Sequence, residues 1–428
     1  MAGTITKVVG KFFHHGLPYV MLSNVAQQGV AFVTVLVIAR YLAPEEFAMV
    51  RLALAYVAIA TVLAVGGITA PVLRYCADVA LQDEERRSFL GVSIRRVMLI
   101  SFVVLGAALA WVVWWSEDPV QAKVYTAYVL QLPGLAVTSL VLVYLQAVQR
   151  FKALALYQVA IRLAALILSV GAVMVWGLPG FLVAGGLLAY LSCIPLLALA
   201  RPQWYPQASF QLPKDFSSLA LYSVLGTVVT SIGHFADLII LDVTGVPNAA
   251  IAVYSLANVF FFAALAVGGA VQSVATPLFT GLMHDPEQFQ RRLMRWSVLL
   301  ALVAIPVALF LVGLAWVVET QFLDSHYAGL SGLLAILMLK FFLWSTYAVG
   351  GAALVGVGAI RQGAWIAVLG TITTIAIGLP LCTRYGVLGA AWTQVMVAVM
   401  TAILIGWVLV VEVHALHRRA HATRRSNA

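Results

Sequence analysis

The sequence predicts an all-α polytopic membrane protein with about twelve transmembrane helices in two six-helix lobes and both termini in the cytoplasm. Three observations carry this prediction: a very apolar composition, a series of long apolar runs, and an uneven distribution of cations between those runs. Of the 428 residues, 63% are hydrophobic and 10% are charged, whereas a soluble domain has about 45–50% apolar and about 25% charged residues. Such a chain cannot cover its apolar surface in water, so its solvent must be lipid.

The apolar runs are each long enough to cross a bilayer, which takes roughly 20 residues. Six of them lie in the first half of the chain, at 17–39, 48–72, 97–115, 122–148, 154–176 and 180–200. Six more lie in the second half, at 217–241, 250–274, 296–318, 328–356, 363–383 and 387–411.

These runs divide the chain into four parts. We expect an N-terminal lobe over 1–200, a cytoplasmic interlobe linker over 201–216, a C-terminal lobe over 217–412 and a basic cytoplasmic tail over 413–428. Between the second and third runs, the segment 81–96 mixes charged and apolar residues, and we expect it to form a short amphipathic helix on the inner membrane face.

The cations determine the predicted orientation. Of the 25 lysines and arginines, 19 lie at the termini or in even-numbered connections, and only Arg40, Lys123 and Arg384 lie in odd-numbered connections. Cytoplasmic loops are the ones enriched in lysine and arginine, so both termini are expected in the cytoplasm. The formal net charge of +9 is therefore attributed to membrane topology, and nucleic acid is not expected as a partner.

The two halves of the chain contain related motifs in the same order. Gly177-Leu-Pro-Gly180 precedes the last run of the first half, and Gly386-Val-Leu-Gly389 precedes the last run of the second. Ala48–Ala53 resembles Ala252–Ala257 in the same way, at a nearly constant offset. This pattern predicts two six-helix repeats of one orientation, and transporters with such repeats bind substrate between them.

Several motifs carry a resemblance to a known family. Ala39-Arg-Tyr-Leu-Ala-Pro-Glu-Glu-Phe-Ala48, the segment Ala236–Ala257, Ala275-Thr-Pro-Leu-Phe279 and Tyr385-Gly-Val-Leu-Gly-Ala-Ala391 resemble the oligosaccharide flippases. These form the polysaccharide-transporter branch of the multidrug/oligosaccharidyl-lipid/polysaccharide (MOP) superfamily. The chain departs from the family at Ala48, where glycine is usual. Its first span also lacks the acidic residue of many cation-coupled drug exporters in the superfamily.

The resemblance implies a fold, a function and partners. It implies two lobes in a V shape around a central cavity, as in the MATE transporters. It also implies that a polyprenyl-diphosphate-linked oligosaccharide is moved across a bacterial inner membrane for cell-surface or exopolysaccharide assembly. Membrane lipids, a polysaccharide polymerase and other assembly proteins are the partners expected. The family motifs do not include substrate-binding residues, so we derive candidates from the sequence.

Three cations lie inside predicted spans: Arg51, Arg162 and Lys340. A cation within a membrane is costly, and it is commonly retained to bind a substrate or an ion. We expect these three to attract the diphosphate of the substrate. The alternative for Arg51 and Arg162 is that their long side chains reach the membrane interface, since both lie within about two turns of a helix end.

A polar stripe follows the seventh span. Its residues recur at intervals of three or four and so share one helix face: Ser223, Thr227, Thr230, His234 and Asp237. We expect this face to line the cavity, because polar groups cannot point into lipid without partners. His234 and Asp237 can also touch, either as a proton-coupling pair or as a structural hydrogen-bonded pair.

Uncharged polar residues offer further candidates. Asn24 with Gln28, and Tyr254 with Asn258, are separated by four residues and can contact sugar hydroxyls from a single helix face. They can equally hold helices together. No nucleotide-binding loop or metal-ligand spacing occurs in the sequence, so we expect no enzyme activity, no cofactor and no metal.

Two other functions stay open at this point. In a cation-coupled exporter of small molecules, Asp237 is the essential acid and the buried cations are structural. In a non-transporting scaffold of a polysaccharide-assembly complex, the lobes persist and the cavity is inert. An anionic lipid substrate predicts a cationic cavity, a drug exporter predicts an acidic one, and a scaffold predicts an apolar plug.

Overall fold

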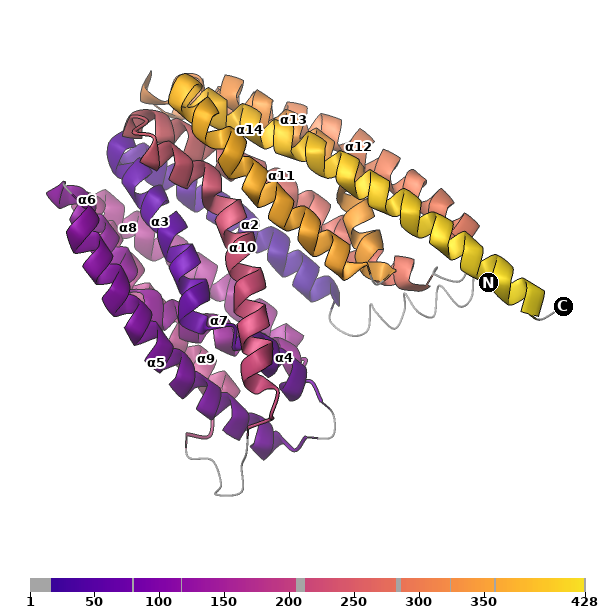
Figure 1. Cartoon of the computed structure of the whole chain (residues 1–428). Coiled ribbons are helices and arrows are strands. Elements are labelled where there is room, and N and C mark those ends of the chain that lie inside the picture. The colour runs from indigo at the N-terminus through magenta and orange to yellow at the C-terminus, as the bar shows by residue number, and fades with distance from the viewer. Residues whose placement is uncertain are drawn as a thin grey trace. The chain divides into compact units, whose positions relative to one another are not determined.

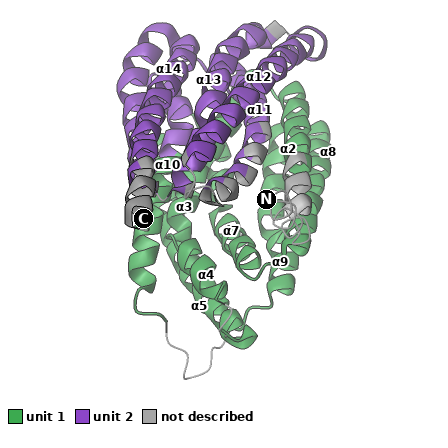
Figure 2. Ribbon diagram, turned by 90° about the vertical axis from the view of Figure 1, so that its right-hand side faces the viewer, with its two compact units in different colours: residues 1–231 green, residues 232–428 purple. Residues whose placement is uncertain are grey.

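The structure is a computed structural model that describes residues 17–78, 81–116, 118–204, 212–281, 286–323, 325–357 and 359–426. Every regular element within these ranges is a helix. The chain divides into two compact units, residues 1–231 and 232–428 (Figure 2). The boundary falls inside α10 (Phe216–Val243), so this helix contributes its first part to unit 1 and its last part to unit 2.

Unit 1 contains the helices of the first half of the chain (Figure 1). These are α2 (Leu17–Tyr41), α3 (Pro44–Val65), α4 (Thr69–Cys76), α5 (Asp83–Trp115), α6 (Pro119–Val129), α7 (Leu132–Ala147), α8 (Phe151–Leu191) and α9 (Cys193–Ala200). Their core contains fully buried aliphatic side chains such as Val72, Leu90 and Leu140 from α4, α5 and α7.

Unit 2 contains the helices that follow α10. These are α11 (Asn248–Gly281), α12 (Pro286–Val317), a π-helical turn (Val318–Phe322), a 3₁₀ turn (Ser325–Tyr327), α13 (Leu330–Gly356) and α14 (Ile360–Ser426). One core cluster joins Phe279, Phe289 and Ala353, from α11, α12 and α13.

The number of membrane-crossing helices agrees with the sequence prediction. Nine helical stretches of the described residues are long and apolar enough to span a bilayer. Two of them, Phe151–Ala200 and Arg361–His414, each contain an internal glycine at which the helix direction changes. Because each of these stretches supplies two limbs, and because the shorter apolar helix Ala26–Tyr41 adds another, they match the twelve predicted runs.

The glycines at these two turns confirm the motif repeat found in the sequence. Gly177 has φ 59° and ψ −144°, and Gly386 has φ 56° and ψ −132°, a conformation that only glycine adopts readily. Three residues later, a Cβ atom on Gly180 would lie 2.5 Å from the Ala172 carbonyl oxygen, and one on Gly389 would lie 2.1 Å from that of Leu381. In each unit the second glycine therefore lets the two limbs pack closely.

One expectation about local structure was wrong. The segment 81–96 does not form a separate amphipathic helix, because α5 runs without interruption from Asp83 to Trp115. The segment is nevertheless two-faced: Phe89, Leu90 and Ile94 are buried in the core of unit 1, whereas Arg95 is exposed. The apolar face continues directly into the spanning part of the helix, so nothing in the sequence ends the helix between them.

Candidate functional site

The polar centre of unit 2 begins at Asp237 on α10, a residue that is only 7% exposed. Its Oδ2 atom accepts a hydrogen bond of 2.6 Å from the Tyr254 hydroxyl and a longer one of 3.5 Å from Asn258 Nδ2. Its Oδ1 atom accepts one of 2.9 Å from the Leu238 backbone N–H. A buried carboxylate needs such donors, because its desolvation is otherwise costly.

Lys340 on α13 occupies a second polar position in the same unit. Its Nζ atom donates a hydrogen bond of 2.6 Å to Gln394 Oε1 on α14 and lies 4.5 Å from the ring centroid of Phe261 on α11. Gln394 is itself buried. The amide oxygen and the aromatic face both stabilise a cation without neutralising it.

One face of α11 connects these two positions. Tyr254, Asn258 and Phe261 are spaced by four and three residues and therefore share a helix face. Tyr254 and Asn258 contact Asp237, and Phe261 contacts Lys340. Unit 2 therefore holds a buried carboxylate and a lysine beside one face of α11, with no direct ion pair between them among the described residues.

His234 does not pair with Asp237 as the sequence spacing allows. Its ring stacks on Phe262 with centroids 4.8 Å apart and meets the ring of Phe235 edge-on at 4.9 Å. The described residues include no hydrogen bond or ion pair between His234 and Asp237. The imidazole is exposed, whereas the carboxylate is turned toward α11. Proton coupling by this pair therefore stays a prediction without a direct contact to support it.

The rest of the polar stripe lies on the part of α10 that belongs to unit 1. Thr227 and Thr230 are exposed and Ser223 is half-buried. Both threonine hydroxyls donate to carbonyl oxygens of their own helix, those of Ser223 and Gly226, at 2.8 and 2.9 Å. Threonine hydroxyls that bond within their own helix can line a polar cavity, and they can equally lie outside one.

The other candidate residues are less closely organised. Arg51 on α3 is half-buried and Arg162 on α8 is exposed, both in unit 1, whereas Lys340 belongs to unit 2. Gln28 on α2 is exposed, and the side chain of Asn24 lies outside the described residues. Tyr254 and Asn258, candidates for either sugar contacts or contacts between helices, are buried and hydrogen-bonded to Asp237.

Sequence reasoning missed Gln394 and Phe261, the two groups that hold Lys340. Gln394 lies 54 positions from Lys340 in an apolar run, and Phe261 is one of 20 phenylalanines. The signal available for Gln394 was its polarity inside a predicted span, since such residues usually have a partner. No comparable signal marks Phe261.

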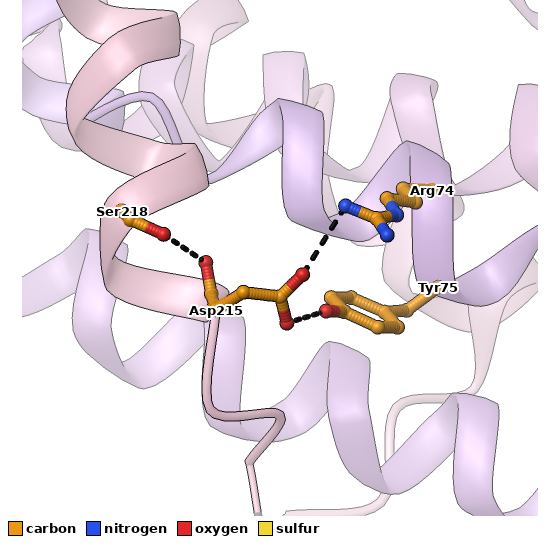
Figure 3. Close-up of polar contacts among 4 residues, drawn as sticks. All are labelled: Arg74, Tyr75, Asp215 and Ser218. Carbon is orange, nitrogen blue, oxygen red and sulfur yellow. Dashed lines mark hydrogen bonds and ion pairs between the residues drawn. The ribbon is translucent and has the colours of Figure 1, made fainter.

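The connection between the halves of the chain is also attached to unit 1 by polar contacts (Figure 3). Asp215 accepts hydrogen bonds from the Tyr75 hydroxyl and from an Arg74 guanidinium nitrogen, the latter at 3.2 Å. The hydrogen bond from Tyr75, helped by the charge of Arg74, lowers the pKa of the Asp215 carboxyl. At the other end of the connection, Gln203 accepts a hydrogen bond of 2.9 Å from Ser88.

A family model for "Polysaccharide biosynthesis protein" matches residues 14–283 of the chain. No curated protein matches the sequence.

Solved structures share the fold along nearly the whole chain. The lipid II flippase MurJ, in an inward closed conformation, superposes with a TM-score of 0.72 at 15% identity and covers 94% of this chain and 91% of its own. An inward-facing multidrug resistance MATE transporter of the MOP superfamily has a TM-score of 0.69 at 14% identity, and the match covers 93% of this chain and 98% of the transporter. A MOP superfamily transporter from Pyrococcus furiosus, described as having a binding pocket of reverse polarity, gives 0.68 at 14% identity, with 94% and 96% covered. The chain therefore has the fold of MOP superfamily transporters.

Proposed function

Because the chain belongs to the polysaccharide biosynthesis protein family, we propose that it is a flippase for a polyprenyl-diphosphate-linked oligosaccharide. It moves this lipid across a bacterial inner membrane by alternating access between its two lobes, for cell-surface or exopolysaccharide assembly. The fold shared with a protein named as a lipid II flippase supports this choice. A polysaccharide polymerase and other assembly proteins are the partners proposed.

The observation that carries the proposal is the setting of Lys340. A lysine at the centre of a membrane helix costs about 3 kcal/mol, and the described residues pair its charge with no carboxylate. Gln394 and Phe261 hold the ammonium group in position while leaving it cationic. Retaining such a charge is useful where the substrate carries an anionic diphosphate through apolar surroundings.

In this proposal Lys340 stabilises the diphosphate, and Arg51 and Arg162 supply further positive charge from unit 1. Thr227, Thr230 and His234 are exposed on α10 and offer polar contacts to the sugars. The lipid tail stays in hydrocarbon throughout, so the protein needs polar groups only for the head group.

The test uses a strain that lacks the chromosomal gene and carries plasmid-borne variants. We expect the deletion to accumulate lipid-linked glycan on the cytoplasmic leaflet and to lose surface glycan, and the wild-type protein to reverse both effects. Lys340→Met should fail to restore export, because it keeps the length of the side chain and removes its charge. Lys340→Arg should restore part of it, because it keeps the charge.

The matched control is Lys152→Met, which removes an exposed lysine from the first turn of α8. This variant should export glycan like the wild type at equal membrane levels. Normal surface glycan in the deletion strain would overturn the proposed substrate. Full export by Lys340→Met would overturn the role assigned to Lys340.

A second candidate is a cation-coupled exporter of small molecules. It is favoured by the buried carboxylate of Asp237, which Tyr254 and Asn258 hold in an apolar setting, and by the fold shared with a multidrug resistance transporter. Under this alternative the deletion strain exports glycan normally and becomes sensitive to cationic drugs, and Asp237→Asn does not restore resistance. A protein that acts only as a scaffold instead tolerates both Lys340→Met and Asp237→Asn.

A further inference from the structure

A groove in unit 2, separate from the Asp237 and Lys340 positions, lies among α12, α13 and α14. Its volume is about 610 Å³. Its walls are formed chiefly by apolar side chains, including Leu293, Tyr347, Ile405, Leu409 and Val413. Along α14 it extends from Ala402 to His414, a length of about 18 Å at the helical rise of 1.5 Å per residue. It can therefore hold an extended hydrocarbon chain.

One end of this groove is rich in arginine and contains a histidine. His414 lines the groove and is exposed, and Arg418 follows it by four residues on the same face of α14 and is also exposed. On α12, the exposed Arg291 adjoins the lining residue Gln290. Glu287, in the first turn of α12, subtracts one charge at this end.

Among the described residues, one further acid, Glu412, lies nearby in sequence, and the arginines of this end outnumber the two carboxylates. Glu412 on α14 accepts a hydrogen bond of 3.4 Å from Gln362 Nε2, and it does not line the groove. The charged end of the groove contains the start of α12, where Arg292 and Arg295 also lie, and the end of α14. Arg361, at the start of α14, lies near this end, because its neighbour Gln362 contacts Glu412. The positive-inside bias assigns this end to the cytoplasm.

We propose that this groove binds an anionic phospholipid of the cytoplasmic leaflet. An acyl chain lies along α14 between Leu293 and Leu409, and the phosphate lies near Arg291, His414 and Arg418. Basic pockets between transmembrane helices on the cytoplasmic side are suited to anionic head groups. The apolar walls match a hydrocarbon chain and offer few partners to a sugar. The proposal is independent of the transported substrate.

The experiment measures lipid binding to the delipidated, detergent-solubilised protein by native mass spectrometry. Dioleoylphosphatidylglycerol is compared with dioleoylphosphatidylcholine, which has the same chains and no net charge, and with inorganic phosphate. We expect the anionic lipid to bind more tightly than the zwitterionic one and phosphate alone to show no stable adduct.

Two variants test the two parts of the groove. Gly406→Leu fills the groove, and a Cβ at this position meets no atom within 4 Å, so the helix tolerates it. It should weaken binding of both lipids. The double variant Arg291→Gln/Arg418→Gln should weaken binding of the anionic lipid alone by about thirtyfold, at about fivefold for each cation near the head group.

Each variant has a matched control. Gly313→Leu adds the same side chain at an open position on α12 outside the groove, and Lys123→Gln/Lys152→Gln removes two exposed cations from unit 1. Both should bind lipid like the wild type. Equal affinity for the two lipids, or equal losses in the controls, would overturn the proposal. So would a wild-type dimer that Gly406→Leu dissociates, because a second copy would then cover the groove.

Discussion

Tyr254 donates the shortest hydrogen bond to Asp237, at 2.6 Å, and the Tyr254→Phe substitution removes it. The buried carboxylate then retains the Leu238 N–H and the long contact from Asn258. Losing a donor to a buried charged group should lower the free energy of unfolding by about 1.5–3 kcal/mol. Thermal unfolding in detergent micelles measures this loss. Tyr222→Phe is the control, since Tyr222 is exposed on α10, and an equal shift in both variants would contradict the assignment.

Asp215 gives a pH-dependent prediction outside the membrane-spanning segments. Its pKa lies below the ordinary value of about 3.9, chiefly because the Tyr75 hydroxyl donates to the charged form. A lowered pKa in the folded state means that the contact contributes stability above the ordinary pKa and loses it as the pH falls through the lowered value. We expect amide hydrogen exchange at 214–219, corrected for intrinsic rates, to accelerate in acid.

Asp215→Asn should show this accelerated exchange already at neutral pH, because it removes the charge that Tyr75 and Arg74 bind. The control is Asp118→Asn, which changes an acid that caps α6 by accepting from the Val120 N–H. Exchange at 214–219 that is unchanged in Asp215→Asn would show that the contact does not hold this connection.

At the scale of single residues, the buried charged side chains could be predicted from the sequence, but their hydrogen-bond partners could not. Lys340 and Asp237 stand out because ionisable residues are rare in apolar runs. Spacing alone suggested His234 as the partner of Asp237, whereas Tyr254 from the next helix donates to it. Partner choice depends on how each helix is rotated against its neighbours, and periodicity fixes a face without saying what that face meets.

Among the elements, the two glycine turns offer the sharpest test of the local backbone conformation. Gly177→Ala and Gly386→Ala each place a Cβ on a residue with positive φ and strongly negative ψ, which should cost about 1–3 kcal/mol of stability. The control Gly106→Ala lies in helical α5 with open space around it and should be neutral or stabilise by up to about 1 kcal/mol. Thermal unfolding distinguishes these outcomes, and equal changes at all three positions would contradict the assigned strain.

The helices themselves were predictable because membrane spans require long apolar runs. The division of the last two runs near Arg384 and Gly386 was also predictable, because a helical hairpin there has glycine at the turn. The start of α5 at Asp83 could not be predicted in the same way. An amphipathic segment and a spanning segment join smoothly when no glycine or proline separates them, and composition alone does not mark the junction.

For the whole molecule, the charge distribution predicts sidedness. Single cysteines replacing Lys123 and Lys214, both exposed, in a background without Cys76, Cys193 and Cys382 should react with a membrane-impermeant thiol reagent from opposite sides. Lys123→Cys should be labelled in intact cells and Lys214→Cys only in inverted vesicles. Labelling of both from the same side would contradict the orientation.

The fold class followed from composition and charge, and it agrees with the shared MOP transporter fold. The substrate does not follow from these features, since transporters of one fold carry different cargoes. In the proposed function, Lys340 links the fold to an anionic lipid cargo, because a cation held in the membrane suits an anionic head group.

The central claim is that this protein moves a lipid-linked oligosaccharide with the help of the Lys340 charge. Its most direct test is translocation of a polyprenyl-diphosphate-linked oligosaccharide in proteoliposomes containing only the purified protein, followed by a glycan-cleaving enzyme added outside. We predict that wild-type protein makes inner-leaflet glycan accessible to the enzyme and that Lys340→Met does so at least tenfold more slowly, a loss of about 1.4 kcal/mol in transition-state stabilisation. Accessibility no greater than in protein-free liposomes, or equal rates for both proteins, would contradict the account.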